Sequence, residues 1–407
     1  MNQNNSYDVV IVGGSLAGCT AAIFWGRCGL KVALLERRPQ MTDYKKLCTH
    51  FILASATPTT ERLGLAAAIE GAGGIRTNHE FWTQYGWVRP VEDKRFPAYG
   101  YNIRRQKLDP LLREMAQATP GVDLHLGYVA QALIWKNGRV TGVIAGHNHQ
   151  KYTFHTRLVV AADGHYSKMA QMAQVPTHTK TNNRFGYMAY YRNLPLKSDQ
   201  NCQLWLLNPD AAYMFPTDDN LTLAACMPTK EKLNDFKYDI SSNFHNYLQG
   251  LPDGPDLNQG KCVSDIMGVL QYDLISRQPV WKGMALIGDA ALSSDPLWGI
   301  GCGWAFQSAE WLVSATADTL LRDGELEPKL RQYKRQHTHN LMGHHHYISN
   351  FATGRRLYGV ERISFAVAVK DVACAQHMHA FGCRHISAAR FFSPLAFART
   401  LWACTTK

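Results

Sequence analysis

The sequence predicts an α/β fold with a parallel sheet and flanking helices, an inserted antiparallel sheet, and a C-terminal helical lobe. A strand–turn–helix–strand unit occupies residues 7–36, and two further short apolar runs, at 157–162 and 283–288, are typical of buried parallel strands. Residues 184–227 alternate in polarity and are rich in aromatic side chains, as expected of antiparallel strands. With 407 residues, the chain is long enough for a large core and two or three lobes.

The first unit has the sequence YDVVIVGGSLAGCTAAIFWGRCGLKVALLE. Its apolar run Val9 to Val12 predicts a buried strand that ends in a glycine turn. Small residues from Ala17 to about Arg27 predict a helix that ends at Gly29. A second apolar run, Val32 to Leu35, stops at the acidic Glu36. This order and spacing predict a dinucleotide-binding βαβ unit.

Each residue of the turn has a physical reason to be there. Gly13 permits the tight turn out of the strand, and Gly14 and Ser15 let the backbone approach a pyrophosphate. Ser15 stands where the second glycine of the G-x-G-x-x-G pattern is usual, and its side chain is small. Gly18 allows the helix to pack closely on the sheet, and the helix N-terminus offers free N–H groups to phosphate. Glu36 is placed to accept hydrogen bonds from a ribose.

The following elements are predicted from periodicity and turn residues. Residues 102–118 have helical spacing, Asn137–Gly138 marks a hairpin, and the strand 157–162 ends at Asp163. Residues 73–101 carry aromatic side chains and predict strands of a second sheet. Further helices are predicted at 232–248 and 304–322, and residues 328–407 are mostly helical, with breaks at Gly354 and Pro394.

These elements suggest four segments. Residues 1–180 form the first part of a dinucleotide-binding domain, and 181–275 form an inserted antiparallel-sheet substrate domain. Residues 276–327 return to the first domain, and 328–407 form the C-terminal helical region. Aromatic residues of the inserted sheet are candidates for the wall of a substrate pocket, although strand alternation allows only some of them to face it: Tyr187, Tyr190, Trp205, Tyr213 and Phe215.

Composition narrows the function classes. The net charge of +11 comes from dispersed basic residues, which favours an anionic cofactor over nucleic acid because no basic run is interleaved with aromatics. The ten cysteines contain no C-x-x-C pair, which predicts reduced thiols in a cytoplasmic protein and no zinc or other metal site. The sequence contains no apolar run of about 18 residues, the length a membrane span needs.

Two stretches near the C-terminus have alternative interpretations. The adjacent residues His344, His345 and His346 point to different sides of a helix and cannot share one ion, so we interpret them as a solvated polar run. The stretch 363–402 mixes apolar and basic residues, as a membrane-surface helix does. We interpret it instead as amphipathic helices packed on the core, without membrane contact.

Three motifs occur in order along the chain. They are VGGSLAG (12–18) followed by Glu36, AADGHYS (161–167), and GDAALSSDPLWGIGCG (288–303), with Arg105-x-x-Leu108 lying between the first two. Together they resemble the group A, or p-hydroxybenzoate-hydroxylase-like, FAD-dependent monooxygenase superfamily. Flavin-dependent halogenases and geranylgeranyl reductases are relatives of that superfamily. The resemblance covers nearly the whole chain.

The resemblance implies a set of FAD-binding residues. The first turn would hold the pyrophosphate, Glu36 the adenosine ribose, and Arg37 would pack beside the adenosine. Arg105 would contact phosphate or the ribityl chain, Asp163 would support its turn beside the cofactor, and Asp289 would accept from ribityl hydroxyls. The backbone at the last motif would meet the flavin pyrimidine edge. The full set implied is Gly13, Gly14, Ser15, Ala17, Gly18, Glu36, Arg37, Arg105, Asp163, Asp289, Gly299, Gly301 and Cys302.

The resemblance also implies an activity. Such an enzyme uses NAD(P)H as a transient reductant and O₂, and oxygenates an aromatic or apolar small molecule of specialised metabolism through a flavin C4a-hydroperoxide. Alternatives from the same relatives are a halogenase, a geranylgeranyl-reductase-like FAD reductase, or a flavin-dependent oxidase or cyclase. The W-x-W-x-I-P motif of tryptophan halogenases is absent. The segment around Cys48 slightly resembles the cysteine-bearing loop of the reductases, and we interpret Cys48 as a buried thiol.

Overall fold

The computed structural model describes residues 4–198, 200–396 and 398. Its first large sheet contains five parallel strands in the order β21-β11-β1-β2-β8. Their bounds are β1 Asn4–Val12, β2 Val32–Glu36, β8 Val122–Leu126, β11 Gln150–Ala161 and β21 Met284–Leu286. The hairpin β9 Val129–Lys136 and β10 Arg139–His147 extends this sheet from β11, and β20 Val280–Trp281 lies antiparallel to β21. The turn at Asn137–Gly138 is therefore the predicted hairpin.

The two faces of this sheet are covered differently. Alternate residues of β1, such as Val9 and Ile11, pack with the helices α1 Leu16–Arg27, α4 Arg105–Gln117 and α8 Gly301–Leu321. The residues between them, Val10 and Val12, face the other core cluster, which includes β10 side chains. The N-termini of α1 and α8 thus lie at the same edge of the sheet, because both helices follow parallel strands.

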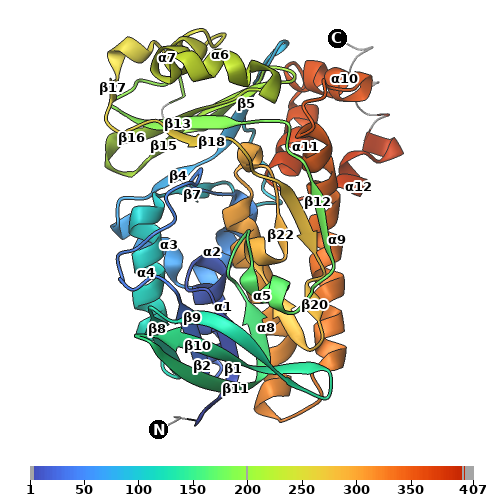
Figure 1. Ribbon diagram of the computed structural model, residues 1–407. Coiled ribbons are helices and arrows are strands. Elements are labelled where there is room, and N and C mark those ends of the chain that lie inside the picture. Colours follow the sequence, from blue (N-terminus) through green and yellow to red (C-terminus); the bar gives the residue numbers. More distant parts are fainter. Residues whose placement is uncertain (1–3, 199, 397, 399–407) are drawn as a thin grey trace.

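The second large sheet has the order β17-β13-β16-β15-β14-β5-β6, with β18 paired to β13. Its bounds are β5 His79–Thr83, β6 Gly86–Val88, β13 Gly186–Arg192, β14 Cys202–Leu206, β15 Ala211–Thr217, β16 Leu221–Met227, β17 Lys261–Cys262 and β18 Met267–Val269. The inserted segment 181–275 therefore does not build this sheet alone, because β5 and β6 come from residues 79–88. Figure 1 shows the sheet above the parallel sheet, with α6 Leu233–Tyr238 and α7 Ile240–Gln249 beyond it.

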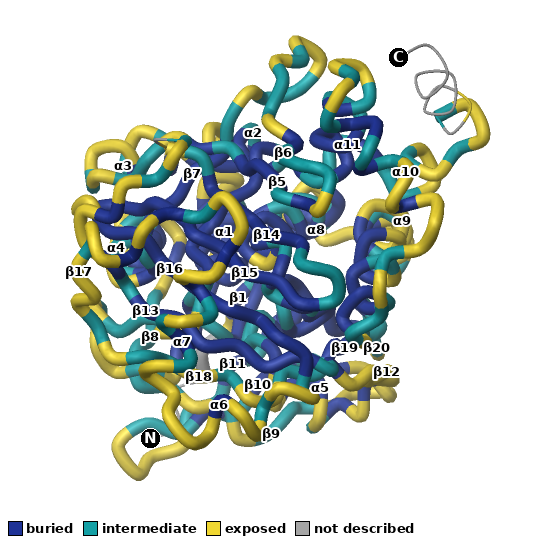
Figure 2. Tube along the Cα trace, turned by 90° about the horizontal axis from the view of Figure 1, so that it is seen from above, coloured by how far each residue is buried: buried dark blue, intermediate teal, exposed yellow. Residues whose placement is uncertain are grey.

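Shorter elements join the two large sheets. The segments β3 Phe51–Ile52, β4 Ile75–Thr77 and β7 Gly100–Asn102 form one three-stranded sheet, and β12 Thr177–Lys180, β19 Leu274–Arg277 and β22 Leu292–Ser293 form another. Short helices in the first half of the chain are α2 Thr57–Arg62, α3 Leu65–Gly71 and α5 Lys168–Met172. Figure 2 shows β1, β14 and β15 buried at the centre, with exposed residues at the rim.

The C-terminal region is helical, as predicted. The long α9 Glu327–Phe351 packs on α8 and extends to the lobe formed by α10 Gly359–Ala368, α11 Val372–Gly382 and α12 Ala388–Phe391 (Figure 1). The break after α9 contains Gly354, as expected. The end of the stretch 363–402 and Cys404 lie outside the described residues. In the part of the chain that is described, none of the helices is both long and apolar enough to cross a membrane.

Three sequence expectations need correction. The helix predicted over 232–248 is two helices, because Asp239 has extended backbone (φ −151°, ψ 91°) and caps α7. The helix predicted over 102–118 begins only at Arg105. His344 and His345 are buried rather than solvated: the imidazole Nε2 of His344 bonds to the carbonyl of Ile386. Only His346 of the three is exposed.

Candidate functional site

The turn between β1 and α1 is held by contacts that leave no room for a side chain. A Cβ atom at Gly13 would lie 2.3 Å from Ala162 O, and one at Gly18 would lie 1.8 Å from Gly13 O. Gly13 also has φ +114°, which an L-amino acid rarely adopts. Within the described residues, no side chain caps the N-terminus of α1 at Ser15. The first N–H groups of this helix therefore remain available to an anion.

Glu36 closes the turn from the end of β2. Its carboxylate is buried and accepts from the backbone N–H of Gly14 at 2.7 Å and of Arg38 at 2.9 Å. A Cβ at Gly14 would meet the Glu36 side chain at 2.8 Å. Arg37 is exposed, whereas the guanidinium of Arg38 lies 3.5 Å from the Glu36 carboxylate.

A buried charged stripe on α4 faces the same turn. The guanidinium of Arg105 donates to Ser15 Oγ at 2.5 Å and to Asp109 Oδ1 at 2.8 Å. One turn after Asp109, Arg113 donates to the carbonyl of Gly14 at 2.9 Å. Only Arg105 was predicted. The spacing of four residues between Arg105, Asp109 and Arg113 is a signal for the others, because it places all three on one face of the helix.

The other two motifs meet the first turn. A Cβ at Gly13 would lie 2.9 Å from the N atom of Asp163, so the second motif touches the first. A Cβ at Gly288 would lie 3.1 Å from Ala17 Cβ and 3.6 Å from Ala305 Cα, so the third motif lies between the starts of α1 and α8. The three turns, distant in sequence, therefore converge in space.

The Asp163 carboxylate holds its own turn together. It accepts from Ser167 Oγ at 2.6 Å and from the Met169 N–H at 3.0 Å, which fixes the turn and the start of α5. Burial raises the pKa of this carboxyl group. Next to it, the carbonyl of His165 accepts from Arg277, which ties the turn to β19.

The start of α8 offers a second free helix N-terminus. No described side chain caps it at Ile300. Gly299 has φ +61° and packs against Phe51, while a Cβ at Gly301 would have only Asp289 Oδ1 nearby, at 3.8 Å. Asp289 itself lies after β21 in the turn Gly288–Ala290. The α8 N-terminus and the Asp289 carboxylate thus border the same space.

The loop between β2 and β3 crosses this space and was largely missed by the sequence analysis. The ammonium of Lys45 lies 3.1 Å from Asp289 Oδ2, and its backbone N–H donates to Asp109 Oδ2 at 3.0 Å. The Asp289 carboxylate raises the pKa of Lys45. Cys48 Sγ lies 3.7 Å from Cys302 Sγ, at the start of α8. The Cys302 thiol, a hydrogen bond from His50 and the charge of Arg105 hold the pKa of Cys48 well below its usual range.

The face of the second sheet that looks toward these turns carries Tyr190, Tyr213 and Phe215. Tyr190 Oη lies 2.5 Å from His50 Nε2, and Phe215 packs against Phe51. The hydroxyl of Tyr213 is buried without a hydrogen-bond partner among the described residues.

The other two pocket candidates were wrong. Tyr187 and Trp205 belong to the core cluster under α6 and α7 on the opposite face of this sheet. Tyr187 stacks on Phe236, and Trp205 donates to the carbonyl of Pro252. The cause is strand alternation: Tyr187 and Tyr190 are three residues apart on β13 and point to opposite faces.

Comparison with known proteins shows the family of this chain. The family model described as "FAD binding domain" matches residues 6–339. The chain belongs to this family. It is therefore an FAD-dependent oxidoreductase. The uncapped starts of α1 and α8, and the turn cradle that a Cβ would fill, fit the phosphates and flavin of FAD.

Individual relatives differ in activity. The chain is 23% identical over 337 residues to a digeranylgeranylglycerophospholipid reductase of Thermoplasma acidophilum, covering 80% of this chain and 82% of that protein. A flavin-dependent brominase has a similar structure, with a TM-score of 0.80, 15% identity, and coverage of 98% of this chain and 99% of the other. The p-nitrophenol 4-monooxygenase of Pseudomonas putida gives a TM-score of 0.78 and 15% identity, with coverage of 94% and 99%.

Proposed function

We propose that this FAD-dependent oxidoreductase is a monooxygenase that uses NAD(P)H and O₂ to oxygenate an aromatic or apolar small molecule. The FAD-binding residues would be those implied by the three motifs, joined by Asp109, Arg113 and Lys45. When bound, FAD supplies the redox chemistry. The residues of this chain position the substrate, exclude water and hold protons.

The observation that carries the proposal is a pair of phenol groups on the inner face of the second sheet. His50 Nδ1 accepts the backbone N–H of Arg105 at 3.1 Å. In a neutral imidazole the proton then lies on Nε2 and is donated to Tyr190 Oη. The hydroxyl hydrogen of Tyr190 is therefore left to donate elsewhere. Burial raises the pKa of Tyr190, which keeps this donor protonated.

The second phenol completes the arrangement. The Tyr213 hydroxyl is buried and unpartnered among the described residues, on the same face as Tyr190. A buried hydroxyl without a partner costs about 1–3 kcal/mol, and a substrate oxygen would satisfy it. The surrounding rings of Phe51, Phe215 and Trp298 suit an aromatic or apolar skeleton. The p-nitrophenol monooxygenase is a structural neighbour whose name describes such a substrate.

The test is a substrate screen on the FAD-loaded protein. Monooxygenation predicts that one phenolic or related compound stimulates NADPH or NADH oxidation under air, and that one atom of isotopically labelled dioxygen enters the product. Consumption of O₂ with all of it recovered as hydrogen peroxide would contradict the proposal. Dependence of product formation on bromide or chloride would point to halogenation instead.

A second candidate is reduction of a prenyl-chain double bond, as in the curated relatives. The observation that favours it is Cys48, a half-buried thiol whose pKa is held low beside the start of α8. A low pKa predicts alkylation of Cys48 by iodoacetamide at pH 7, blocked by bound FAD or a prenyl lipid. The Cys302→Ala variant removes the thiol donor and should slow that alkylation. Anaerobic reduction of a prenyl lipid by the reduced enzyme would establish this activity and displace the first proposal.

A further inference from the structure

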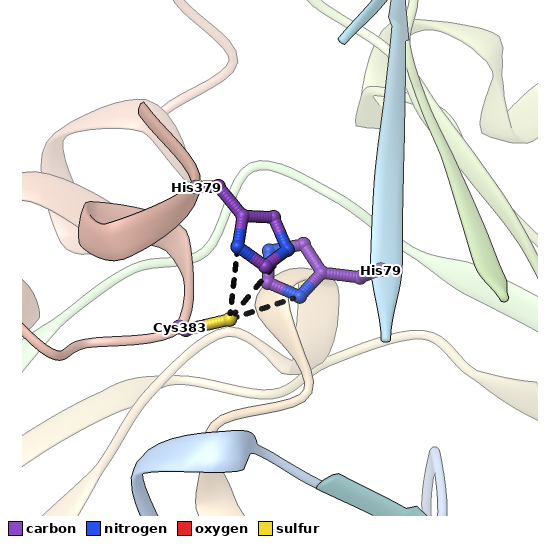
Figure 3. A group of neighbouring side chains, drawn as sticks. All are labelled: His79, His379 and Cys383. Carbon is purple, nitrogen blue, oxygen red and sulfur yellow. Dashed lines mark hydrogen bonds between the residues drawn. The ribbon is translucent and has the colours of Figure 1, made fainter. Parts of the chain in front are cut away.

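A cluster of three metal-ligating side chains lies outside the cofactor site. His79 begins β5 of the second sheet, whereas His379 and Cys383 come from the end of α11 and the residue after it (Figure 3). All three are buried, with exposed fractions of 4%, 9% and 0%. One nitrogen or sulfur atom from each lies within 4.8 Å of those from the other two. About three hundred residues of sequence separate the strand from the helix.

The sulfur–nitrogen distances fit one tetrahedral zinc ion. With Zn–S of about 2.3 Å and Zn–N of about 2.0–2.1 Å, tetrahedral angles place sulfur and nitrogen ligands about 3.6 Å apart. Cys383 Sγ lies 3.6 Å from His79 Nδ1 and 3.8 Å from each ring nitrogen of His379. The His79 and His379 rings are stacked, with centroids 4.8 Å apart and planes 19° apart, so the His379 ring must turn about its Cβ–Cγ bond to aim one nitrogen at the ion.

The surroundings fix the ligand atom of His79. A Cβ at Gly382 would lie 2.7 Å from His79 Nε2, so this nitrogen faces the α11 backbone, and Nδ1 faces the thiol. Nε2 has no hydrogen-bond partner in the described part of the chain. The neighbouring Arg384 donates to Ser55 and Gln307, so its charge is directed away from the cluster.

The donor set selects the metal. Two imidazoles and a thiolate are borderline-to-soft ligands, which favour zinc over magnesium or calcium. His379 also lines a surface groove with Asn78, Phe96 and His385. This groove provides a path by which the ion can enter, and it gives water access to the fourth coordination position. We propose that His79, His379 and Cys383 bind one Zn²⁺ ion that fastens α11 of the C-terminal lobe to β5 of the second sheet.

The consequence is a further link between two regions that already meet through a hydrogen bond from Arg362 on α10 to Tyr85 Oη in the β5–β6 turn. Phe81 on β5 packs on both His79 and Trp298, the residue just before Gly299. The ion would therefore hold the lobe one side-chain layer from the proposed substrate pocket. Because metal binding to a folded site adds to folding free energy, the bound ion should stabilise the full chain.

The test is metal analysis of the full-length, FAD-loaded protein. After loading with ZnCl₂ and removal of excess metal, the wild-type chain should keep one zinc per chain and unfold at a higher temperature than the chelator-treated protein. His79→Gln and Cys383→Ser should each bind zinc more than about tenfold more weakly. Cys374→Ser, on the same helix but outside the cluster, is the matched control and should bind like the wild type.

A second readout does not depend on how the variants fold. Cobalt(II) added to the wild-type chain in place of zinc should give a thiolate-to-metal charge-transfer band, which only a Cys-ligated ion produces. Absence of that band, absence of retained zinc in the wild type, or full zinc retention by Cys383→Ser would each overturn the proposal. Retention of copper or iron with no affinity for zinc would also overturn it.

Discussion

The sheet that carries the FAD motifs is packed through close backbone contacts, whereas the sheet that covers it is packed through large side chains. Around β1, backbone atoms approach one another so closely that Gly13, Gly14 and Gly18 have no room for a Cβ atom. In the covering sheet and the lobe beside it, the contacts are between bulky side chains, such as Trp205, Tyr213 and Phe381. We propose that the first region holds FAD through its backbone and that the second contacts the substrate through side chains. Relatives that share the fold but differ in name are consistent with this division.

The largest expected effect is the loss of FAD affinity caused by Gly18→Ala, in the region packed through its backbone. The added Cβ would lie 1.8 Å from Gly13 O, so the turn that holds the pyrophosphate must move. We expect the dissociation constant for FAD to rise by about 100-fold or more, equivalent to about 3 kcal/mol. Flavin content and FAD titration of the apoprotein measure this.

Gly71→Ala is the control for that substitution. Gly71 is also helical, in α3, but a Cβ there would meet nothing within 4 Å. Alanine should keep FAD affinity unchanged and leave thermal stability equal or slightly higher. Equal FAD binding by both variants would show that close backbone approach is not what fixes the cofactor.

In the C-terminal helical region, the largest expected effect is a loss of folding stability as the pH falls. Burial lowers the pKa of His344 and of His345 to about 4, below the ordinary value of 6.5. Between pH 6.5 and 4 the unfolded chain binds protons that the folded chain does not, so stability is complete above pH 6.5 and falls as the pH falls. Each histidine contributes a loss of about 3 kcal/mol at most.

His345→Gln isolates one of these contributions. The His345 Nε2–H donates to the carbonyl of Ser293 at 3.2 Å, and a glutamine amide can do the same without titrating. Its Nδ1 is buried without a hydrogen-bond partner among the described residues, so no acceptor stabilises a proton added there. Urea unfolding should therefore show a smaller loss of stability between pH 7 and 4.5 for His345→Gln, and no change for the exposed His346→Gln. If His345→Gln left the pH dependence of stability unchanged, protonation of His345 would be ruled out as a cause of the loss at low pH.

A smaller effect is expected from Glu36→Gln at the cofactor. The carboxylate accepts two backbone N–H groups, from Gly14 and Arg38, and an amide has only one oxygen to accept with. We expect FAD affinity to fall about tenfold, equivalent to about 1.4 kcal/mol. Glu70→Gln, at an exposed ion pair with Arg76, should leave FAD binding unchanged. Titration of the two apoproteins with FAD distinguishes these outcomes.

The two regions also differ in how far sequence alone predicts them. The three turns proposed to hold FAD lie together in the fold, because glycine positions and strand ends have strict local requirements that a short motif records. Lys45 was missed because its ion-pair partner, Asp289, lies more than two hundred residues away in the sequence. Asp109 and Arg113 could have been predicted from the sequence. Their spacing of four and eight residues from Arg105 places all three side chains on one face of the helix.

The covering sheet was predicted as strands, but the face on which each pocket candidate lies was not. Aromatic composition identified candidates, and only the register of β13 to β16 shows that Tyr190 faces the turns while Tyr187 does not. The buried cluster of His79, His379 and Cys383 has no local pattern, because its members come from opposite ends of the chain. Burial of His344 and His345 was missed for the same reason, since their partners Ile386 and Ser293 are distant in sequence.

The smallest expected effect is on kcat/KM, and it tests whether strand register decides which side chains of β13 contact the substrate. Tyr190 and Tyr191 are neighbours on β13, but Tyr190 meets His50 and Tyr191 lies in the cluster on the opposite face. Tyr190→Phe removes one hydrogen bond, worth about 1 kcal/mol, so kcat/KM for the substrate found by the screen should fall about fivefold. Tyr191→Phe should change it by less than about twofold, because its ring packing is kept. Equal loss in both variants would mean that the covering sheet acts on activity through stability, and the two phenols would no longer explain how the substrate is held.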